Sequence, residues 1–201
     1  MENSDLKFVF NNILSKNISS YFKPFKYKRQ GNNFKYYDKE QNFGKIINFQ
    51  KSQFSQINFV INIGIYIPEF EYYFYKIPKI SNEKFTEPIC AIRTRIGNLK
   101  NESDIWYELK EKTDIDKLVE DLENDIKNYV IPFLKNFVNK KYIFEQIFMK
   151  RYYGNYEIAR IKTLYKNGFK ENIINIIGNE NYQWKYKGVV LDKINDWIEN
   201  N

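Results

Sequence analysis

The chain has 201 residues, of which 43% are hydrophobic and 28% charged, with a net charge of +7 and no histidine. This length and composition are typical of one soluble globular domain. The absence of histidine excludes Ser-His-Asp and Cys-His nucleophiles, and the single cysteine, Cys90, excludes an internal disulfide and a Cys/His zinc site.

The N-terminal residues MENSDLKFVF lack a basic segment followed by an apolar one, so they do not indicate a secretory signal. No window approaches the roughly 18 uninterrupted apolar residues that a membrane-spanning helix needs. We therefore expect a cytoplasmic protein that does not associate with membranes.

The chain is predicted to begin with a helix and a hairpin. An amphipathic helix is expected over about residues 4–18, because Leu6 and Phe10 recur at helical spacing. Residues 23–39 predict two short strands joined by a turn at Gly31.

Three longer strands are expected next, over residues 44–52, 57–68 and 89–97. The second of them alternates most clearly, with these apolar residues on one face: Phe59, Ile61, Ile63, Ile65 and Ile67. A connection that contains three prolines separates it from the third strand.

The second half of the chain is predicted to be helical. Residues 113–130 place apolar side chains on one helical stripe, after the candidate capping residues Thr113 and Asp114. Pro132 is expected to kink this helix or to start another, and helical patterns return from residue 140 onward.

These elements predict an α+β fold with a mostly antiparallel sheet of about four to six strands. We expect the N-terminal helix and the long central helix to cover one face of this sheet. The predicted division is an α+β sheet domain over residues 1–138 and a helical C-terminal extension over 139–201, packed on the sheet domain as one structural unit.

A polar sheet face is the main candidate site. Arg93 and Arg95 are two positions apart in an expected strand, so their side chains point the same way. If the apolar strand faces all point to the helices, these residues gather on the opposite face: Asn48, Gln50, Asn62, Tyr66, Arg93 and Arg95. Gly64 would leave backbone accessible among them. Such a face could bind an anion, a peptide carboxylate or a phosphate, for which the planar guanidinium is suited.

Internal pairing is the alternative interpretation of the two arginines. Antiparallel sheets commonly leave one polar face to water, so arginines there need no ligand. Glu69 and Glu71 would be available as their salt-bridge partners.

The hairpin within residues 23–39 is a second candidate site. It interleaves basic and aromatic residues, which can hold phosphates while bases stack: Lys26, Tyr27, Lys28, Arg29 and Tyr36. The alternative is an amphipathic hairpin whose aromatic side chains enter the core and whose lysines are solvated.

We assign no catalytic residue, and we expect no metal ion and no cofactor. The acidic residues of the helix over 113–130 have the spacing of a solvated face. Cys90 is expected to be a small buried side chain, because no histidine can activate it. Trp106 and Tyr107 are expected in the core.

Several of these segments together resemble the family catalogued as domain of unknown function 4304, over roughly residues 5–135. The most specific motifs are Gln50-Lys51-Ser52, Asn62-x-Gly64, and Arg93-x-Arg95-Ile96-Gly97 followed by Trp106. The resemblance supports the fold and the residues of the polar face, and it implies no reaction.

The leading hypothesis for function is a small binding protein without catalysis, which recognises a protein partner or an acidic ligand through the polar sheet face. An immunity-like role would be consistent with it by analogy. The alternative is a nucleic-acid-associated protein that uses the hairpin, and an enzyme based on carboxylate, tyrosine or lysine chemistry ranks third.

Overall fold

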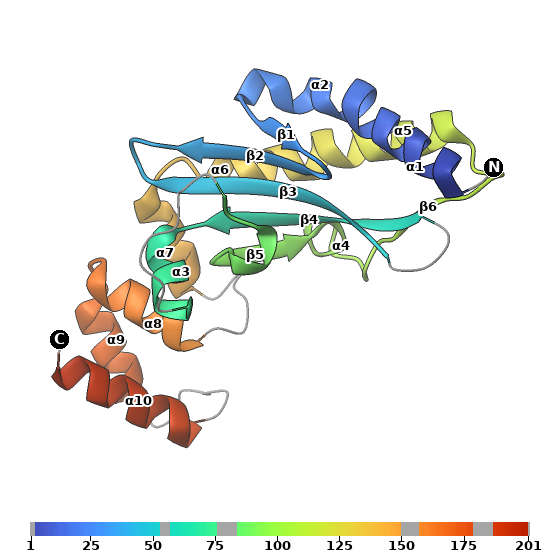
Figure 1. The fold of residues 1–201 in the computed structure, drawn as a ribbon. Helices are drawn as coiled ribbons and strands as arrows, with labels where there is room; N and C mark the ends of the chain where they lie inside the picture. Colours follow the sequence, from blue (N-terminus) through green and yellow to red (C-terminus); the bar gives the residue numbers. More distant parts are fainter. Residues whose placement is uncertain (1–2, 53–56, 76–83, 150–156, 179–186, 201) are drawn as a thin grey trace.

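The structure is a computed structural model that describes residues 3–52, 57–75, 84–149, 157–178 and 187–200. Within these residues the fold is α+β, with an antiparallel six-stranded sheet in the order β1-β2-β3-β4-β5 (Figure 1). The sixth strand, β6, pairs with β4 beyond the end of β5. The predicted fold class is confirmed.

The strands are β1 Lys28–Gln30, β2 Asn33–Asp38, β3 Phe43–Lys51, β4 Ile57–Tyr66, β5 Ile92–Arg95 and β6 Tyr107–Leu109. The helices of the first half are α1 Asn3–Asn12, α2 Ser19–Phe22, α3 Pro68–Tyr75 and α4 Ile96–Leu99. The helices of the second half are α5 Ile115–Asp125, α6 Ile131–Asn136, α7 Lys140–Phe148, α8 Glu157–Lys166, α9 Lys170–Ile177 and α10 Lys187–Glu199.

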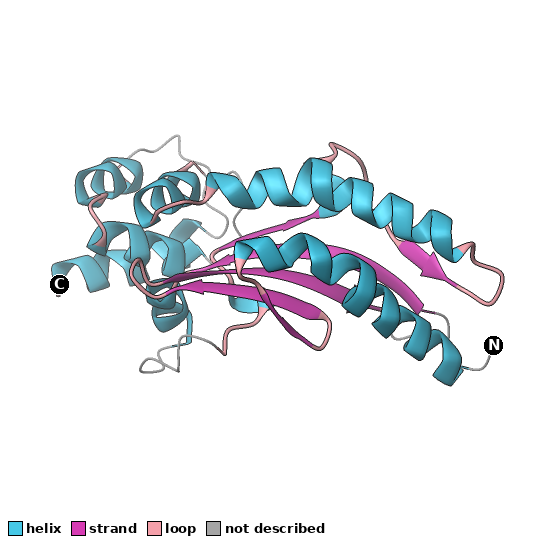
Figure 2. Ribbon diagram, turned by 90° about the horizontal axis from the view of Figure 1, so that it is seen from above, coloured by secondary structure: helices cyan, strands magenta, loops and turns pink. Residues whose placement is uncertain are grey.

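Two helical segments cover one face of the sheet (Figure 2). One runs from α1 through the π-helical stretch Ile13–Ile18 into α2, and the other from α5 through Ile126–Val130 into α6. The carboxylate of Asp114 caps α5 by accepting a 3.1 Å hydrogen bond from the Lys117 backbone amide. The predicted helix pair is therefore present, and the first helix extends as far as Phe22.

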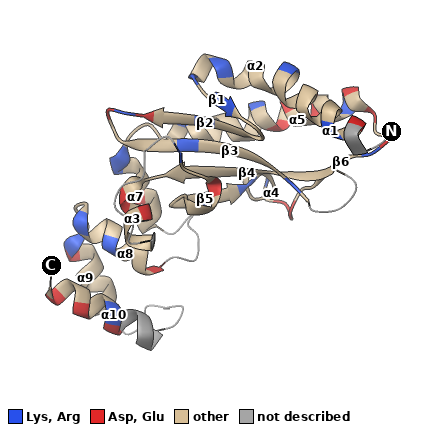
Figure 3. Ribbon diagram, in the orientation of Figure 1, with Lys and Arg blue, Asp and Glu red and all other residues tan. Residues whose placement is uncertain are grey.

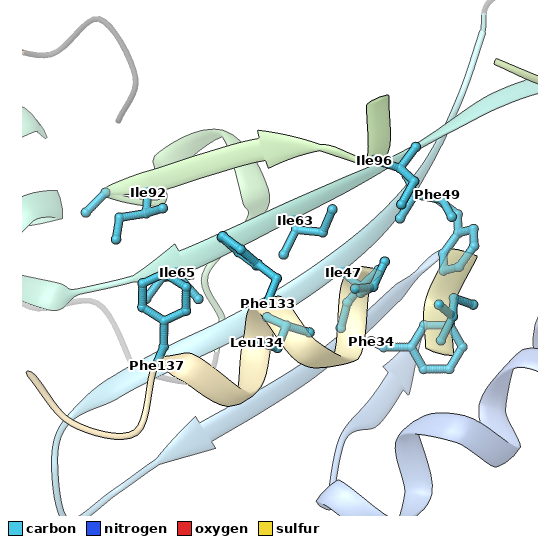
Figure 4. Packing of buried hydrophobic residues seen from close by; sticks show 14 of the residues in the cluster. Phe34, Ile47, Phe49, Ile63, Ile65, Ile92, Ile96, Phe133, Leu134 and Phe137 are labelled. Atoms are coloured by element: carbon cyan, nitrogen blue, oxygen red, sulfur yellow. The ribbon is translucent and has the colours of Figure 1, made fainter. Parts of the chain in front are cut away.

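The core lies between this face of the sheet and the two helical segments. Figure 4 shows buried strand residues packed against the buried Phe133 and Leu134 of α6 and Phe137 directly after it. The strand residues are Phe34, Ile47, Phe49, Ile63 and Ile65. Removal of these apolar side chains from water is the main favourable term in the free energy of folding.

The register of β3 against β4 assigns each of their residues to a face. Ile47 lies opposite Ile63, and Asn48 lies opposite Asn62. Opposed side chains point to the same face and successive side chains alternate, so the isoleucines face the helices and the asparagines face away from them. We call the side that carries the asparagines the polar face.

The polar face is partly covered by the segment that precedes β5. A Cβ atom at Gly44 would lie 2.5 Å from the ring of Phe85, and a Cβ atom at Gly64 would lie 2.6 Å from the sulfur of Cys90. The Phe85 ring also stacks on Tyr66, with ring centroids 4.6 Å apart. The expectation that Gly64 leaves its backbone accessible is therefore wrong, because Cys90 fills that space.

Helices α3 and α7 to α10 pack at one end of the sheet (Figure 1). There α8 packs against α3 and α10 packs against α8. An ion pair of 2.5 Å joins Lys140 at the start of α7 to Glu69 on α3. The proposed domain division after residue 138 stays a prediction. No helix within the described residues combines the length and apolar character that crossing a bilayer requires.

Three elements were not predicted, namely α3, α4 and β6. The connection after β4 contains the helix α3, which begins at Pro68. The three residues of β6 lie outside every strand that the sequence predicted, and they pair with the start of β4. The expected strand over residues 89–97 is shorter than predicted, since β5 ends at Arg95 and α4 follows directly.

Replacement of Gly64 tests how closely the covering segment sits on the sheet. Because a methyl group there would overlap Cys90, we expect Gly64→Ala to lower the free energy of unfolding by about 2 kcal/mol in chemical denaturation. Gly178→Ala is the control, because its nearest neighbour would lie at 3.6 Å and its φ is −74°. Equal stability of Gly64→Ala and the wild-type protein would contradict this packing.

Candidate functional site

The strand pairing brings the predicted residues of the polar face together. Asn48 and Gln50 come from β3, Asn62 and Tyr66 from β4, and Arg93 and Arg95 from β5. Asn62 lies opposite both Asn48 and Arg95, since β4 is paired on each side. All six therefore share one face of the sheet.

Amide side chains from three strands and Arg95 from a fourth form a hydrogen-bonded row, which we call the amide row. The amide nitrogen of Asn62 donates to Gln50 at 2.8 Å and to Asn48 at 3.2 Å. The oxygen of Asn62 accepts from Nε of Arg95 at 3.1 Å, and Asn48 donates to Asn33 on β2 at 2.7 Å. Because the buried Asn62 has partners for both its oxygen and its nitrogen, this row is held in one arrangement.

The two arginines have different surroundings. Arg93 donates through Nε and Nη2 to both carboxylate oxygens of Glu87, at 2.8 and 3.2 Å, and the Glu87 side chain is only 7% exposed. Arg95 pairs with Asp104, and both of these side chains are well exposed, at 38% and 45%. Arg93 thus ties a buried carboxylate to β5, whereas Arg95 lies at the solvent-exposed end of the row.

The expected partners Glu69 and Glu71 are engaged elsewhere. Glu69 pairs with Lys140, and Glu71 accepts a hydrogen bond from the hydroxyl of Tyr66. Tyr66 is 1% exposed, because Phe85 covers its ring. Burial and the Glu71 carboxylate raise the pKa of the Tyr66 hydroxyl well above its usual range. Tyr66 therefore belongs to the covered part of the polar face.

The open part of the polar face is smaller than the sequence predicted. It contains the exposed Gln50 and the guanidinium of Arg95. Trp106, which directly precedes β6, is 42% exposed, so the expectation that it lies in the core is wrong. Tyr107 is buried as expected, and its hydroxyl donates to Asp125.

The structure does not bring the hairpin residues together into one surface. Lys28 is paired with Lys35 and points to the polar face. Arg29 points to the other side and donates to Asn11 on α1 at 3.3 Å. Basic and acidic residues are interspersed over the part of the chain that the structure describes (Figure 3), so charge alone does not mark a track for a polyanion there.

The other hairpin residues line a pocket that the sequence analysis missed. Lys26, Tyr27 and Tyr36 surround a cavity of about 350 Å³ between the hairpin, β3 and α6. Lys45 on β3 and Lys135 on α6 also line it. A pocket of this size suits a small molecule.

Lys45 is the unusual group in this pocket. Lys45 lies opposite Ile65, so its side chain points to the helix-covered side of the sheet. There its ammonium donates a 2.9 Å hydrogen bond to the backbone carbonyl of Leu134. The ammonium also lies 5.8 Å from the centroid of the Tyr36 ring. Burial lowers the pKa of Lys45 to about 8, although the nearby Asp38 carboxylate opposes the shift. A lysine with a lowered pKa in a pocket is a candidate functional group.

Other candidate chemistry is not brought together. Among the described residues, no three acidic, cysteine or histidine side chains approach closely enough to hold a metal ion. Cys90 is buried, and burial raises the pKa of its thiol, which makes the nucleophilic thiolate scarce. On α5, Glu120 and Asp121 form exposed ion pairs with Lys117.

Comparison with known proteins identifies a family but no activity. The family model described as Domain of unknown function (DUF4304) matches residues 18–136, which include all six strands and the pocket residues named above. No curated protein and no solved structure gives a significant match to this chain.

Alanine substitution separates the roles of the two arginines. Arg93→Ala would leave the buried carboxylate of Glu87 without its bidentate partner, so we expect the free energy of unfolding to fall by about 3 kcal/mol. Arg95→Ala removes an exposed ion pair and one hydrogen bond, and we expect a loss of about 1 kcal/mol. Urea denaturation would measure both values, and equal losses would contradict the assignment.

The pH dependence of stability tests the burial of Lys45. The pKa of Lys45 is about 8 in the folded chain, whereas the usual value of 10.5 applies to the unfolded chain. Between these two pH values the unfolded chain therefore binds more protons than the folded chain. The stability of the wild-type protein relative to Lys45→Met should therefore rise between about pH 8 and pH 10.5. A constant difference across this range would show that Lys45 is solvated.

Proposed function

The chain belongs to the family described as Domain of unknown function (DUF4304), whose description states no activity, and we propose from the geometry that it is a non-catalytic binding protein. We propose that it binds a protein partner with an acidic surface through the open part of the polar face, which contains Gln50 and Arg95. The exposed Trp106 is included because it directly precedes Tyr107, which points to the helix-covered side, so alternation would turn Trp106 to the polar face. The observation that carries the proposal is the amide row, which holds Arg95 and Gln50 in place at the surface.

Fixed polar groups bind at a lower entropic penalty than mobile ones. Nε of Arg95 is held by Asn62, and one terminal nitrogen contacts Asp104. Within the described residues its second terminal nitrogen, Nη2, has no hydrogen-bond partner, so it remains available to a carboxylate. Arginine and tryptophan are also the side chains that most often contribute strongly to protein interfaces.

The charges on the polar face favour an acidic partner. Lys28 and Lys35 lie on this face together with the two arginines. Of the carboxylates on this side, Glu87 and Asp104 pair with the arginines, Glu108 pairs with Lys110, and Glu71 accepts from the covered Tyr66. None of these four carboxylates forms an ion pair with Lys28 or Lys35. Electrostatic attraction would therefore orient an acidic surface toward the sheet.

The same observations favour binding over catalysis. Arg93, Tyr66 and Asn62, the more deeply placed polar groups, are engaged with neighbouring side chains rather than directed into a cavity. An immunity-like protein, which holds a toxic partner inactive, would be one form of this function.

Capture experiments with matched variants test the proposal. Partners would be captured on immobilised wild-type protein, on Arg95→Ala, on Gln50→Ala/Trp106→Ala, and on Lys117→Ala/Glu120→Ala as the control on α5. We expect both variants of the polar face to retain at least about tenfold less of a specific acidic partner than the wild-type protein, while the α5 control retains it fully.

The outcomes of this experiment either support or contradict the proposed binding through the polar face. A partner that is lost only from the polar-face variants, and whose binding weakens with added salt, would support the proposal. A partner retained equally by all variants, or lost from the α5 control instead, would contradict it. Circular dichroism and a melting curve for each variant would establish that the chains are folded.

A further inference from the structure

The pocket between the hairpin, β3 and α6 lies on the opposite side of the sheet from the polar face. We propose that this pocket binds a small organic anion that carries an aromatic ring. The site is separate from the polar face, so either proposal can fail without the other. The inference rests on the charges that line the pocket, on the hydrogen-bonding capacity of Lys45, and on the aromatic walls.

Positive charge predominates among the lining residues. Lys26, Lys45 and Lys135 approach from three different segments, and Asp38 is the one carboxylate among the described lining residues. Asp38 already accepts a 2.9 Å hydrogen bond from the backbone amide of Gln41. An anion in the pocket would therefore meet more positive than negative charge.

Lys45 has unused capacity to donate hydrogen bonds. An ammonium group carries three N–H donors, and the Leu134 carbonyl is the one acceptor that the described residues offer to Lys45. The flanking rings of Tyr36 and Phe43, at 5.8 and 5.7 Å, attract the cation but accept no conventional hydrogen bond. A carboxylate or phosphate oxygen would supply the missing acceptors.

Aromatic side chains form the walls of the pocket. The rings of Tyr27 and Tyr36 lie 5.7 Å apart. Phe25 also lines the pocket, is 38% exposed, and has its ring centroid 5.2 Å from the Lys135 ammonium. A flat ring in the ligand could pack on these walls at the offset or edge-to-face distances that aromatic pairs prefer. The walls therefore favour an aromatic anion over a simple inorganic one.

The size and shape of the site favour a small molecule over a polymer. The cavity of about 350 Å³ corresponds to the lower range of small-molecule sites. Lys28 and Arg29, which could have followed a nucleic-acid backbone away from the pocket, point to opposite sides of the sheet. No basic track continues from the pocket through these two residues.

Calorimetric titration with four probes tests the chemistry of the ligand. The probes are 5′-AMP and indole-3-acetate, which join a ring to a phosphate or to a carboxylate, and adenosine and inorganic phosphate, which each lack one half. We expect at least one aromatic anion to bind with a Kd below about 1 mM and about tenfold more tightly than adenosine and phosphate. Binding of 5′-AMP would identify a phosphate as the acidic group, and binding of indole-3-acetate would identify a carboxylate. If neither aromatic anion binds, the proposal is overturned.

Variants with a matched control locate the binding. Lys45→Met and Lys135→Ala should each weaken binding of the aromatic anion about fivefold to tenfold. Lys51→Met is the control, because Lys51 also lies on the helix-covered side of β3, with its ammonium 5.3 Å from the ring of Phe10, and does not line the pocket. Unchanged affinity in Lys45→Met and Lys135→Ala would place the ligand elsewhere and overturn the proposal.

Proton uptake gives an independent readout. The groups that face Lys45 are Lys26 and Tyr27 before β1, Tyr36 and Asp38 on β2, and Lys135 on α6. An anion beside Lys45 would raise its pKa from about 8, so titration at pH 8 should take up about half a proton in the wild-type protein and less in Lys45→Met. Equal uptake by both proteins would contradict a contact between the anion and Lys45.

Discussion

The antiparallel register of β3 against β4 is the constraint on which both candidate sites depend. It places Asn48 opposite Asn62 and Lys45 opposite Ile65. Because side chains alternate at every residue, a slip by one position would exchange the two faces of β3. Asn48 and Gln50 would then point into the helices and leave the amide row, and Lys45 would leave the pocket. Burial of the isoleucines beneath the helical segments opposes such a slip.

The same register separates groups that hold the fold from groups that are open to a ligand. Gly44 and Gly64 leave room on the polar face for the segment before β5, and Arg93 secures that segment through Glu87. Arg95, two residues further along, has the same side-chain direction but lies beyond the covering segment and remains exposed. Two arginines at adjacent positions of one face thus have different roles, which alternation alone could not distinguish.

The sequence predicted what local periodicity determines. Alternation in β3 to β5 predicted which residues share a face, and helical spacing predicted the two covering helical segments. Contacts between distant segments were not predictable in this way, so Glu87 and Asp104 were missed as partners of the arginines. Lys45 carried a usable signal, because it has the same parity as Ile47 and Phe49 and is therefore a lysine on the apolar side of a strand. The three residues of β6 and the eight of α3 were too short to show a clear period.

Nuclear Overhauser contacts between β3 and β4 test the central claim most directly, because they report which residues lie opposite each other. The account predicts contacts of the Asn62 backbone and side-chain amide with Asn48, together with contacts between Gly64 and Ile46. Contacts of Asn62 with Ile47 or Phe49 as its opposed residue would instead mean a register shifted by one. That result would contradict both the amide row and the position of Lys45 in its pocket.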